Sequence, residues 1–352
     1  MSISFMRSVR NQNIESEYIQ IQSGEGQDKP VASTLVSICI PTHNGARWLE
    51  ETLRSALAQT YEPLEILVVD DASTDHTLGI ARSLHDPRVR VEVNKRNLGI
   101  VRNRNRCLML SKGSLVKFLF QDDLLYPTCV EKMARLFEKH NRVGIVFAPR
   151  DVLLENPADP AAVAWKEKYG TLHTRFGIYL GEVNRGVDLF NLWLASGFRE
   201  NWVGEPSNVM LRKSCLEKVG LFNTRMRQCS DYEMWIRMMY FYDVGFIDEP
   251  LSAFRFHSAS TTSASIQQNR HWLDRIWLTE GLLQCEEIRR SHPQIKRLRY
   301  PEARRVAKEQ IARIRRGDHM PILHMLRSLT DYCSYLLRSL SHCAPSIHSE
   351  DS

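Results

Sequence analysis

Two pairs of neighbouring carboxylates follow long apolar runs in this 352-residue chain. Asp70 and Asp71 end the run LEILVVDD, and Asp122 and Asp123 end the run SLVKFLFQDD. Burying four carboxylates together is costly unless a counter-charge neutralises them. Magnesium supplies such a charge with one or two protein carboxylates, and it completes its shell with water and substrate phosphates. The two pairs therefore predict a site for a metal ion and a phosphorylated substrate, although capping of a turn or helix would also explain either pair alone.

Apolar strands that alternate with amphipathic helices must position these carboxylates. Such an alternation predicts an α/β fold with a doubly wound, mainly parallel sheet flanked by helices, and ligands bind at the carboxyl ends of its strands. Both aspartate pairs lie at such ends. The expected strands are 36–41, 64–71, 89–93, 114–120 and 143–149, and the expected helices are 46–59, 75–84, 100–110 and 126–140.

The pattern changes after residue 150. Residues 150–182 contain two prolines and three glycines, which predicts a loop. The later pattern predicts helices at 186–196, 213–219 and 231–242, strands at 207–211 and 244–248, one long helix over 265–290 and further helix to about residue 340.

Composition excludes several classes of protein. Hydrophobic residues make up 43% of the chain and charged residues 25%, which is typical of a globular protein. Residues 286–320 hold 11 Lys or Arg against 5 Asp or Glu, so the net charge of +6 is local and argues against a nucleic-acid-binding core. The eight cysteines form no C-x-x-C pair, and no apolar run is long enough for a signal or a membrane span. These features predict a cytoplasmic protein.

Four motifs follow one another over residues 35–150, namely VSICIPTHN, VVDDASTDHT, NKRNLGIVRNRNRC and FLFQDD. Two more, SDYEMWIRM and RFHSASTT, follow within residues 230–262. In order and spacing they resemble the inverting glycosyltransferases of family 2, which have the GT-A fold. The resemblance implies a nucleotide-sugar-binding half over 35–150 and an acceptor-binding half over 151–262. A mobile leader over 1–34 and a helical, basic and amphipathic extension over 263–345 complete the expected layout.

The resemblance implies a nucleotide-sugar donor, usually a UDP-sugar, and assigns residues to it. Pro41 and Asn44 would lie beside the nucleotide. Asp71 would accept a hydrogen bond from the base, and Asp70 would support the loop or contact the ribose. Arg104 would lie near the nucleotide or diphosphate, although a solvated helix face would also explain it.

The resemblance also implies a divalent metal, magnesium or manganese. The family's Asp-x-Asp motif reads Phe120-Gln121-Asp122 here, so the first aspartate is missing and Asp122 would contact the metal. Asp123 would be the supporting carboxylate on the donor side. His257 matches a histidine that some family members place near the metal or diphosphate, and a structural histidine is the alternative.

Asp231 is the residue expected to carry the chemistry. It opens the run SDYEMWIRM, whose apolar residues form one face of a predicted helix, so the carboxylate lies at the helix start. In the family, this position is the general base that takes the proton from the acceptor hydroxyl. A simple N-cap is the alternative.

The predicted activity is transfer of a sugar from a nucleotide-sugar to a glycan or lipid-linked saccharide, with inversion. The missing metal-motif aspartate leaves a non-catalytic nucleotide-sugar-binding protein as an alternative. A nucleotidyltransferase is another alternative, although a single glycine follows the first strand where such enzymes have a glycine-rich loop. The basic and amphipathic tail predicts peripheral contact with an anionic membrane at its inner face, or else packing on the catalytic domain, and no binding of nucleic acid.

Overall fold

The computed structural model describes residues 34–258 and 274–299 together with Arg304, Lys308, Ala312 and Arg315. The chain divides into two compact units, residues 1–33 and 34–352, and all described residues belong to the second. The leader expected over 1–34 and most of the tail expected after residue 300 lie outside the described residues.

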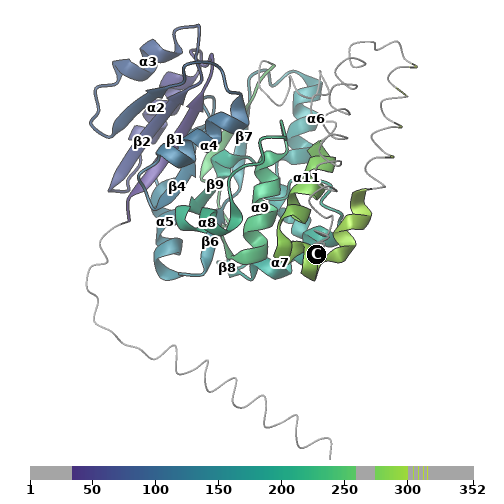
Figure 1. The fold of residues 1–352 in the computed structure, drawn as a ribbon. Helices are drawn as coiled ribbons and strands as arrows, with labels where there is room; N and C mark the ends of the chain where they lie inside the picture. Colours follow the sequence, from purple (N-terminus) through teal and green to yellow (C-terminus); the bar gives the residue numbers. More distant parts are fainter. Residues whose placement is uncertain are drawn as a thin grey trace, which may run out of the picture. The chain divides into compact units, whose positions relative to one another are not determined.

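The main sheet is mainly parallel, and it joins strands from both expected halves (Figure 1). Strand β9 runs antiparallel between β4 and β6, whereas β1, β2, β3 and β4 pair in parallel. The predicted fold class is therefore confirmed. In spatial order the strands are β3 (Val89–Val93), β2 (Leu64–Asp70), β1 (Val36–Thr42), β4 (Leu115–Phe118), β9 (Val209–Arg212), β6 (Val143–Phe147), β10 (Asp243–Phe246) and β8 (Val183–Asn184).

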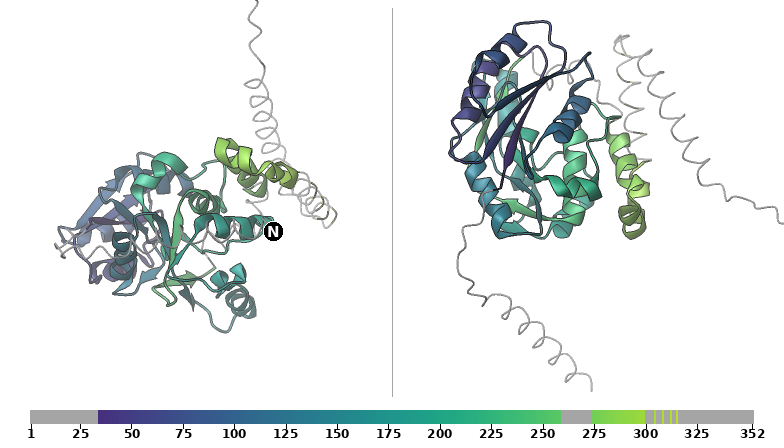
Figure 2. Two further views of the ribbon diagram at one scale, coloured as in Figure 1. Left: turned by 90° about the horizontal axis from the view of Figure 1, so that it is seen from below. Right: turned by 60° about the vertical axis from the view of Figure 1, so that its left-hand side comes forward.

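Helices cover both faces of this sheet (Figure 2). Successive strand residues point to opposite faces, so Ile38 belongs to an apolar cluster with residues of α2, α3 and α5, and Cys39 belongs to another with residues of α4, α7, α9 and α11. This two-sided burial explains why the strands read as continuous apolar runs. The helices are α2 (Leu49–Leu57), α3 (Thr77–Ser83), α4 (Ile100–Leu110), α5 (Cys129–Lys139), α6 (Pro160–Tyr169), α7 (Gly186–Ala195), α8 (Leu216–Val219), α9 (Ser230–Phe241), α11 (Asp274–Gln284) and α12 (Glu286–Ser291).

A second, smaller sheet joins β5 (Leu124–Leu125), β11 (Ser252–Phe256) and β7 (Arg150–Leu154). The sequence did not predict β11, and it wrongly predicted a loop over 150–182. Strand β7 pairs in parallel with β11. Pro160 lies in the first turn of α6 behind the N-cap Asp159, so it begins a helix instead of ending one.

The single long helix expected over 265–290 is also wrong within the described residues. Helix α11 ends at Gln284, and Cys285 adopts an extended conformation with φ −73° and ψ 113°. Glu286 and Glu287 then occupy the first turn of α12, where the helix dipole favours carboxylates. Short 3₁₀ turns complete the fold at η1 (Leu172–Phe176), η2 (Pro206–Asn208), η3 (Lys213–Cys215) and η4 (Pro293–Leu298).

Candidate active site

Asp70 holds together the loops that follow β1 and β2. Its carboxylate accepts hydrogen bonds from the backbone N–H of Ser73 at 2.9 Å and from the Ser73 hydroxyl at 2.5 Å. That hydroxyl oxygen in turn accepts from the backbone N–H of Asn44 at 2.9 Å. Asp70 is buried and Asn44 is exposed with φ 50°, while Pro41 is buried within β1. Asp70 therefore supports the loop, and Asn44 is the most exposed member of this group.

Asp71 binds the segment that leads into α4. Its two carboxylate oxygens accept from the side-chain amide of Asn94 at 2.7 Å and from the backbone N–H groups of Leu98 at 2.8 Å and Gly99 at 2.9 Å. Gly99 has φ 86°, a conformation that glycine adopts without strain. The predicted contact of Asp71 with a nucleotide base stays a prediction, and it would require the carboxylate to share oxygens that these N–H groups already use.

The small sheet brings Asp122 and His257 together, although 135 residues separate them. Asp122 precedes β5 and His257 follows β11, and these two strands pair antiparallel. His257 Nε2 lies 3.0 Å from Asp122 Oδ2, and the two side chains are 8% and 20% exposed. The two residues predicted to serve a metal are thus neighbours. In residues 34–258 and 274–299, no cluster of three or more His, Cys, Asp or Glu side chains is arranged to hold a metal ion.

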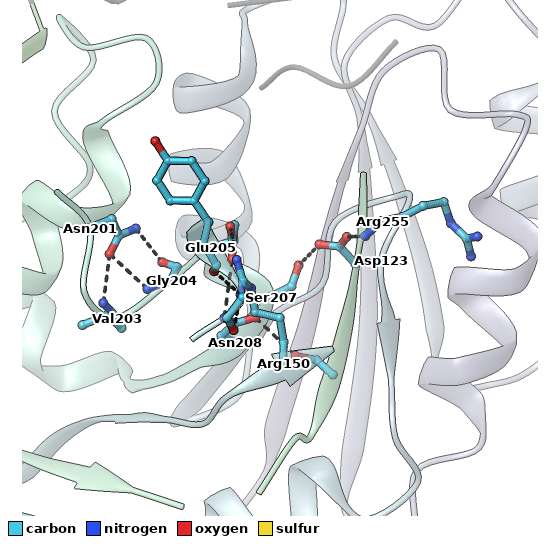
Figure 3. A network of polar contacts seen from close by, with 12 residues as sticks. Asp123, Arg150, Asn201, Val203, Gly204, Glu205, Ser207, Asn208 and Arg255 are labelled. Carbon is cyan, nitrogen blue, oxygen red and sulfur yellow. Dashed lines mark hydrogen bonds and ion pairs between the residues drawn. The ribbon is translucent and has the colours of Figure 1, made fainter. Parts of the chain in front are cut away.

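Asp123 follows Asp122 in the sequence and belongs to a network of polar contacts (Figure 3). Its carboxylate accepts from the Ser207 hydroxyl at 2.5 Å and from the backbone N–H of Arg255 at 3.0 Å, and it has no exposed surface. Burial, and then the charge of Asp122, raise the pKa of Asp123 well above its usual value. The side chain therefore joins three segments of the fold and does not line a surface that a donor could touch.

A buried ion pair fixes the loop that precedes β9. Arg150 donates to both carboxylate oxygens of Glu205, from Nε at 2.7 Å and from Nη2 at 2.9 Å (Figure 3). Its remaining Nη1 donates to the backbone carbonyls of Tyr169 at 2.8 Å and Gly170 at 3.1 Å. A bidentate pair of this kind restricts both partners to one geometry. Glu205 is thereby held close enough to Asp231 to raise the pKa of that residue.

Asp231 lies in the first turn of α9, and Arg104 of α4 faces the same helix start. Arg104 is 3% exposed, and its Nη2 donates to the Ser230 hydroxyl at 2.6 Å. Its guanidinium lies 4.8 Å from the ring centroid of Phe222, and its Nε has no hydrogen-bond partner among the described residues. The alternative of a solvated helix face for Arg104 is therefore wrong.

Two opposing effects act on the pKa of the Asp231 carboxylate. Burial raises its pKa to about 6, and the charge of Arg104 and the backbone N–H of Tyr232 act in the opposite direction. The residue keeps some exposed surface, so a substrate can reach it. A carboxylate with these properties changes protonation state close to neutral pH, which suits proton transfer.

Three residues of this region were not predicted from the sequence. Arg150 directly follows a buried strand, which is a signal that could have been used. Glu205 belongs to the stretch 204–207, whose residue types are as compatible with packing in the core as with a binding site. Asp274 accepts backbone N–H groups just before α9, and no local pattern shows a contact with a segment 45 residues away.

Comparisons with known proteins show what this chain is similar to. The model of Glycosyl transferase family 2 matches residues 37–185. An uncharacterized protein of Mycobacterium tuberculosis is 36% identical over 262 residues, which are 73% of this chain and 80% of that protein. An uncharacterized glycosyltransferase of Rickettsia prowazekii is 28% identical over 248 residues, which are 70% of this chain and 71% of the relative. The crystal structure of S. aureus TarS 1–349 has 18% identity and a TM-score of 0.49, over 74% of this chain and 72% of that one.

The match over 37–185 contains both aspartate pairs and Arg104, and the Mycobacterium tuberculosis relative covers most of the described fold. The chain belongs to glycosyl transferase family 2.

Proposed function

We propose that this glycosyltransferase moves a sugar from a UDP-sugar to a hydroxyl of a glycan or lipid-linked saccharide, by single displacement with inversion. The observation that carries the proposal is Asp231 at the start of α9, with a pKa raised to about 6. A general base works best when its pKa lies near the operating pH. Asp231 meets that condition, and an ordinary exposed aspartate does not.

In the proposed reaction, the Asp231 carboxylate takes the proton of the acceptor hydroxyl while that oxygen bonds to the anomeric carbon of the donor. The bond from the anomeric carbon to the diphosphate oxygen breaks at the same time, and its electron pair leaves with the nucleoside diphosphate. Attack from the face opposite the leaving group inverts the configuration. Arg104 supports this step because a buried guanidinium stabilises charge that develops on a phosphate.

A pH profile tests the role of Asp231. We expect the rate of UDP release to fall about tenfold per pH unit below a midpoint near pH 6, because one proton on the carboxylate removes the base. Above that midpoint the rate should be level, because the carboxylate is then deprotonated. A raised pKa of Asp231 moves the loss of activity to higher pH than for an ordinary aspartate. The measurement is initial UDP release between about pH 5 and pH 8. A rate that stays level down to pH 5, as a base with the ordinary aspartate pKa of 3.8 would give, would contradict the assignment.

Asp122 and His257 fit a divalent cation that is held mostly by other ligands. One carboxylate and one imidazole at 3.0 Å from each other are a partial donor set, and diphosphate oxygens and water would complete the shell. When bound, magnesium or manganese would neutralise charge on the leaving diphosphate. Phe120 in place of the first acidic residue of the motif leaves the protein with fewer ligands, so we expect metal affinity to depend on UDP.

Metal dependence is tested by UDP binding. We expect UDP to bind at least about tenfold more tightly with manganese than with EDTA, and Asp122→Ala to abolish most of that difference. The measurement is isothermal titration with UDP under both conditions. Asp188→Ala is a matched control, because Asp188 lies in the first turn of α7 and its side chain is 58% exposed. Equal affinity with EDTA and manganese would remove the metal from the proposal.

A thermal-shift screen tests the donor class. UDP-, GDP- and dTDP-sugars with manganese would be compared at equal concentration, since a ligand that binds only the folded state raises its melting temperature. We expect UDP-sugars to give the largest shift. A non-catalytic nucleotide-sugar-binding protein would show the shift but release no UDP with a panel of saccharide acceptors, so the two assays together separate that alternative.

Membrane contact remains a proposal that concerns mainly residues 300–345, most of which lie outside the described residues. In the described part, no helix has the length and apolar character needed to span a membrane. Some of the basic surplus of residues 286–320 is used within the fold, because Arg290 pairs with Glu286 and Arg299 pairs with the buried Glu280. Flotation of the full chain with liposomes of anionic lipid tests whether the rest binds a surface, as a lipid-linked acceptor would favour.

A further inference from the structure

Helix α11 belongs to the region expected as an extension outside the catalytic domain, yet it packs directly against α9 (Figures 1 and 2). Its residues Ile276, Trp277, Leu278 and Leu282 are buried in the same cluster as the apolar face of α9. Gly281 lies so close to Glu233 of α9 that an added Cβ would be 2.6 Å from a Glu233 oxygen. The two helices are therefore one packed unit, and a change in α11 reaches the helix that carries Asp231.

The first residue of α11 makes the most specific of these contacts. The carboxylate of Asp274 accepts the backbone N–H of Arg227 at 3.0 Å, of Gln228 at 2.6 Å and of Cys229 at 2.8 Å. These three consecutive groups form the turn that leads into α9, and Asp274 is 2% exposed. Three successive N–H groups make a concave anion site, and here a carboxylate of the same chain fills it.

The start of α9 is thus held from two sides. Arg104 of α4 donates to the Ser230 hydroxyl, and Asp274 of α11 holds the turn that ends at Cys229. Asp231 directly follows Ser230 in the first turn of the helix, so its position depends on these two attachments. The neighbouring Arg275 attaches the start of α11 to a further segment, because it donates to the carbonyls of Gly197 at 3.0 Å and Phe198 at 2.8 Å.

We infer that Asp274 is a positioning residue for catalysis, which fixes the first turn of α9 and thereby orients the Asp231 carboxylate toward the acceptor hydroxyl. The inference rests on the proposed role of Asp231 as the base. It also assigns α11 to the catalytic domain. A displacement of about 1 Å at a reacting group can lower a rate about a hundredfold, so a residue that only holds a turn can still control turnover.

Asp274→Asn tests the inference in the full chain. The amide keeps the size of the side chain but replaces one acceptor oxygen with an NH₂ group that faces backbone N–H groups. We expect amide hydrogen exchange at residues 227–229 to become about tenfold faster. We also expect turnover in UDP-GlcNAc hydrolysis with manganese to fall at least about tenfold, with KM within about twofold.

The pH midpoint separates positioning from general destabilisation. Burial is the largest cause of the raised pKa of Asp231, and loosening of the turn would hydrate the carboxylate, so the substitution should lower that pKa. Arg104, Glu205, Cys229 and Tyr232 are the other charged or titratable groups around it. Arg104 belongs to α4 and Glu205 is held by Arg150, so neither depends on this turn. We therefore expect the midpoint of the rate profile to move below pH 6, the value of the unchanged chain.

Glu280→Gln is the matched control. Glu280 is a buried carboxylate on the same helix, and it pairs with Arg299 instead of with the turn before α9. It should lower the melting temperature while leaving exchange at 227–229 and the pH midpoint unchanged. Unchanged exchange in Asp274→Asn would overturn the inference, as would faster exchange with normal turnover and midpoint. If the unsubstituted protein releases no UDP from any donor, the proposed function fails, and the exchange measurement alone still decides whether Asp274 holds this helix.

Discussion

Asp231→Asn is expected to lower the rate of sugar transfer by about 10²–10⁴-fold, which is the range that a positioned general base contributes. The amide has nearly the same shape as the carboxylate but cannot take a proton from the acceptor hydroxyl. Arg104 keeps its bond to Ser230, so UDP affinity should stay within about twofold. The measurements are UDP release with a saccharide acceptor and UDP titration of the same preparation.

Asp188→Asn is a suitable control for this substitution. Asp188 also lies in the first turn of a helix, α7, and its side chain is 58% exposed. The same chemical change there should leave transfer at the level of the unsubstituted protein, which separates loss of the base from a general effect of removing a charge near a helix start. Near-normal transfer by Asp231→Asn would refute the assignment of the base.

Arg150→Met is expected to lower the free energy of unfolding by about 3–5 kcal/mol. The Arg150 side chain is 2% exposed, and its removal leaves the Glu205 carboxylate and the carbonyls of Tyr169 and Gly170 without their donor. The main cost is the uncompensated charge of Glu205, whose side chain is only 19% exposed. Urea denaturation followed by circular dichroism measures the change, with the m-value as a check that the extent of unfolding is the same.

Arg142→Met provides the comparison. Arg142 forms an ion pair with Asp243 at 3.1 Å, but its side chain is 83% exposed, so the expected loss is below about 1 kcal/mol. The double substitution Arg150→Met with Glu205→Leu should recover part of the loss, because an apolar pair leaves no buried charge. A loss for Arg150→Met no larger than for Arg142→Met would show that Glu205 is not held by this ion pair.

Local patterns predicted the fold of the first half well, because each element there carries its own signal. The helix expected over 100–110 is α4 with the same bounds, and the expected strands match β1, β2, β3, β4 and β6 within a few residues. Strand β11 was missed because it is short and its burial does not alternate along the chain, although it is the central strand of the small sheet. The loop expected over 150–182 failed because Pro160 was read as a helix breaker, whereas Asp159 makes it a helix start.

In the candidate site, too, some residues could be found from local patterns and others could not. Asp70, Asp71 and Asp122 could be found because apolar strands end beside them. The pairing of Asp122 with His257 depends on the register of β5 against β11, and the burial of Arg104 depends on where α9 begins. Such contacts join segments more than 100 residues apart. Arg104 and His257 were indicated only by the resemblance to a family, which did not give the geometry of their contacts.

The antiparallel strand β9 joins two strands of the main sheet that precede it in the sequence. It fills the space between β4 and β6, although it is synthesised about 60 residues after β6. Until residues 209–212 arrive, both neighbours present open backbone N–H and C=O groups that can pair with other chains. The segment 37–185 that matches the family model therefore does not contain every strand of its own sheet, because β9 lies beyond it.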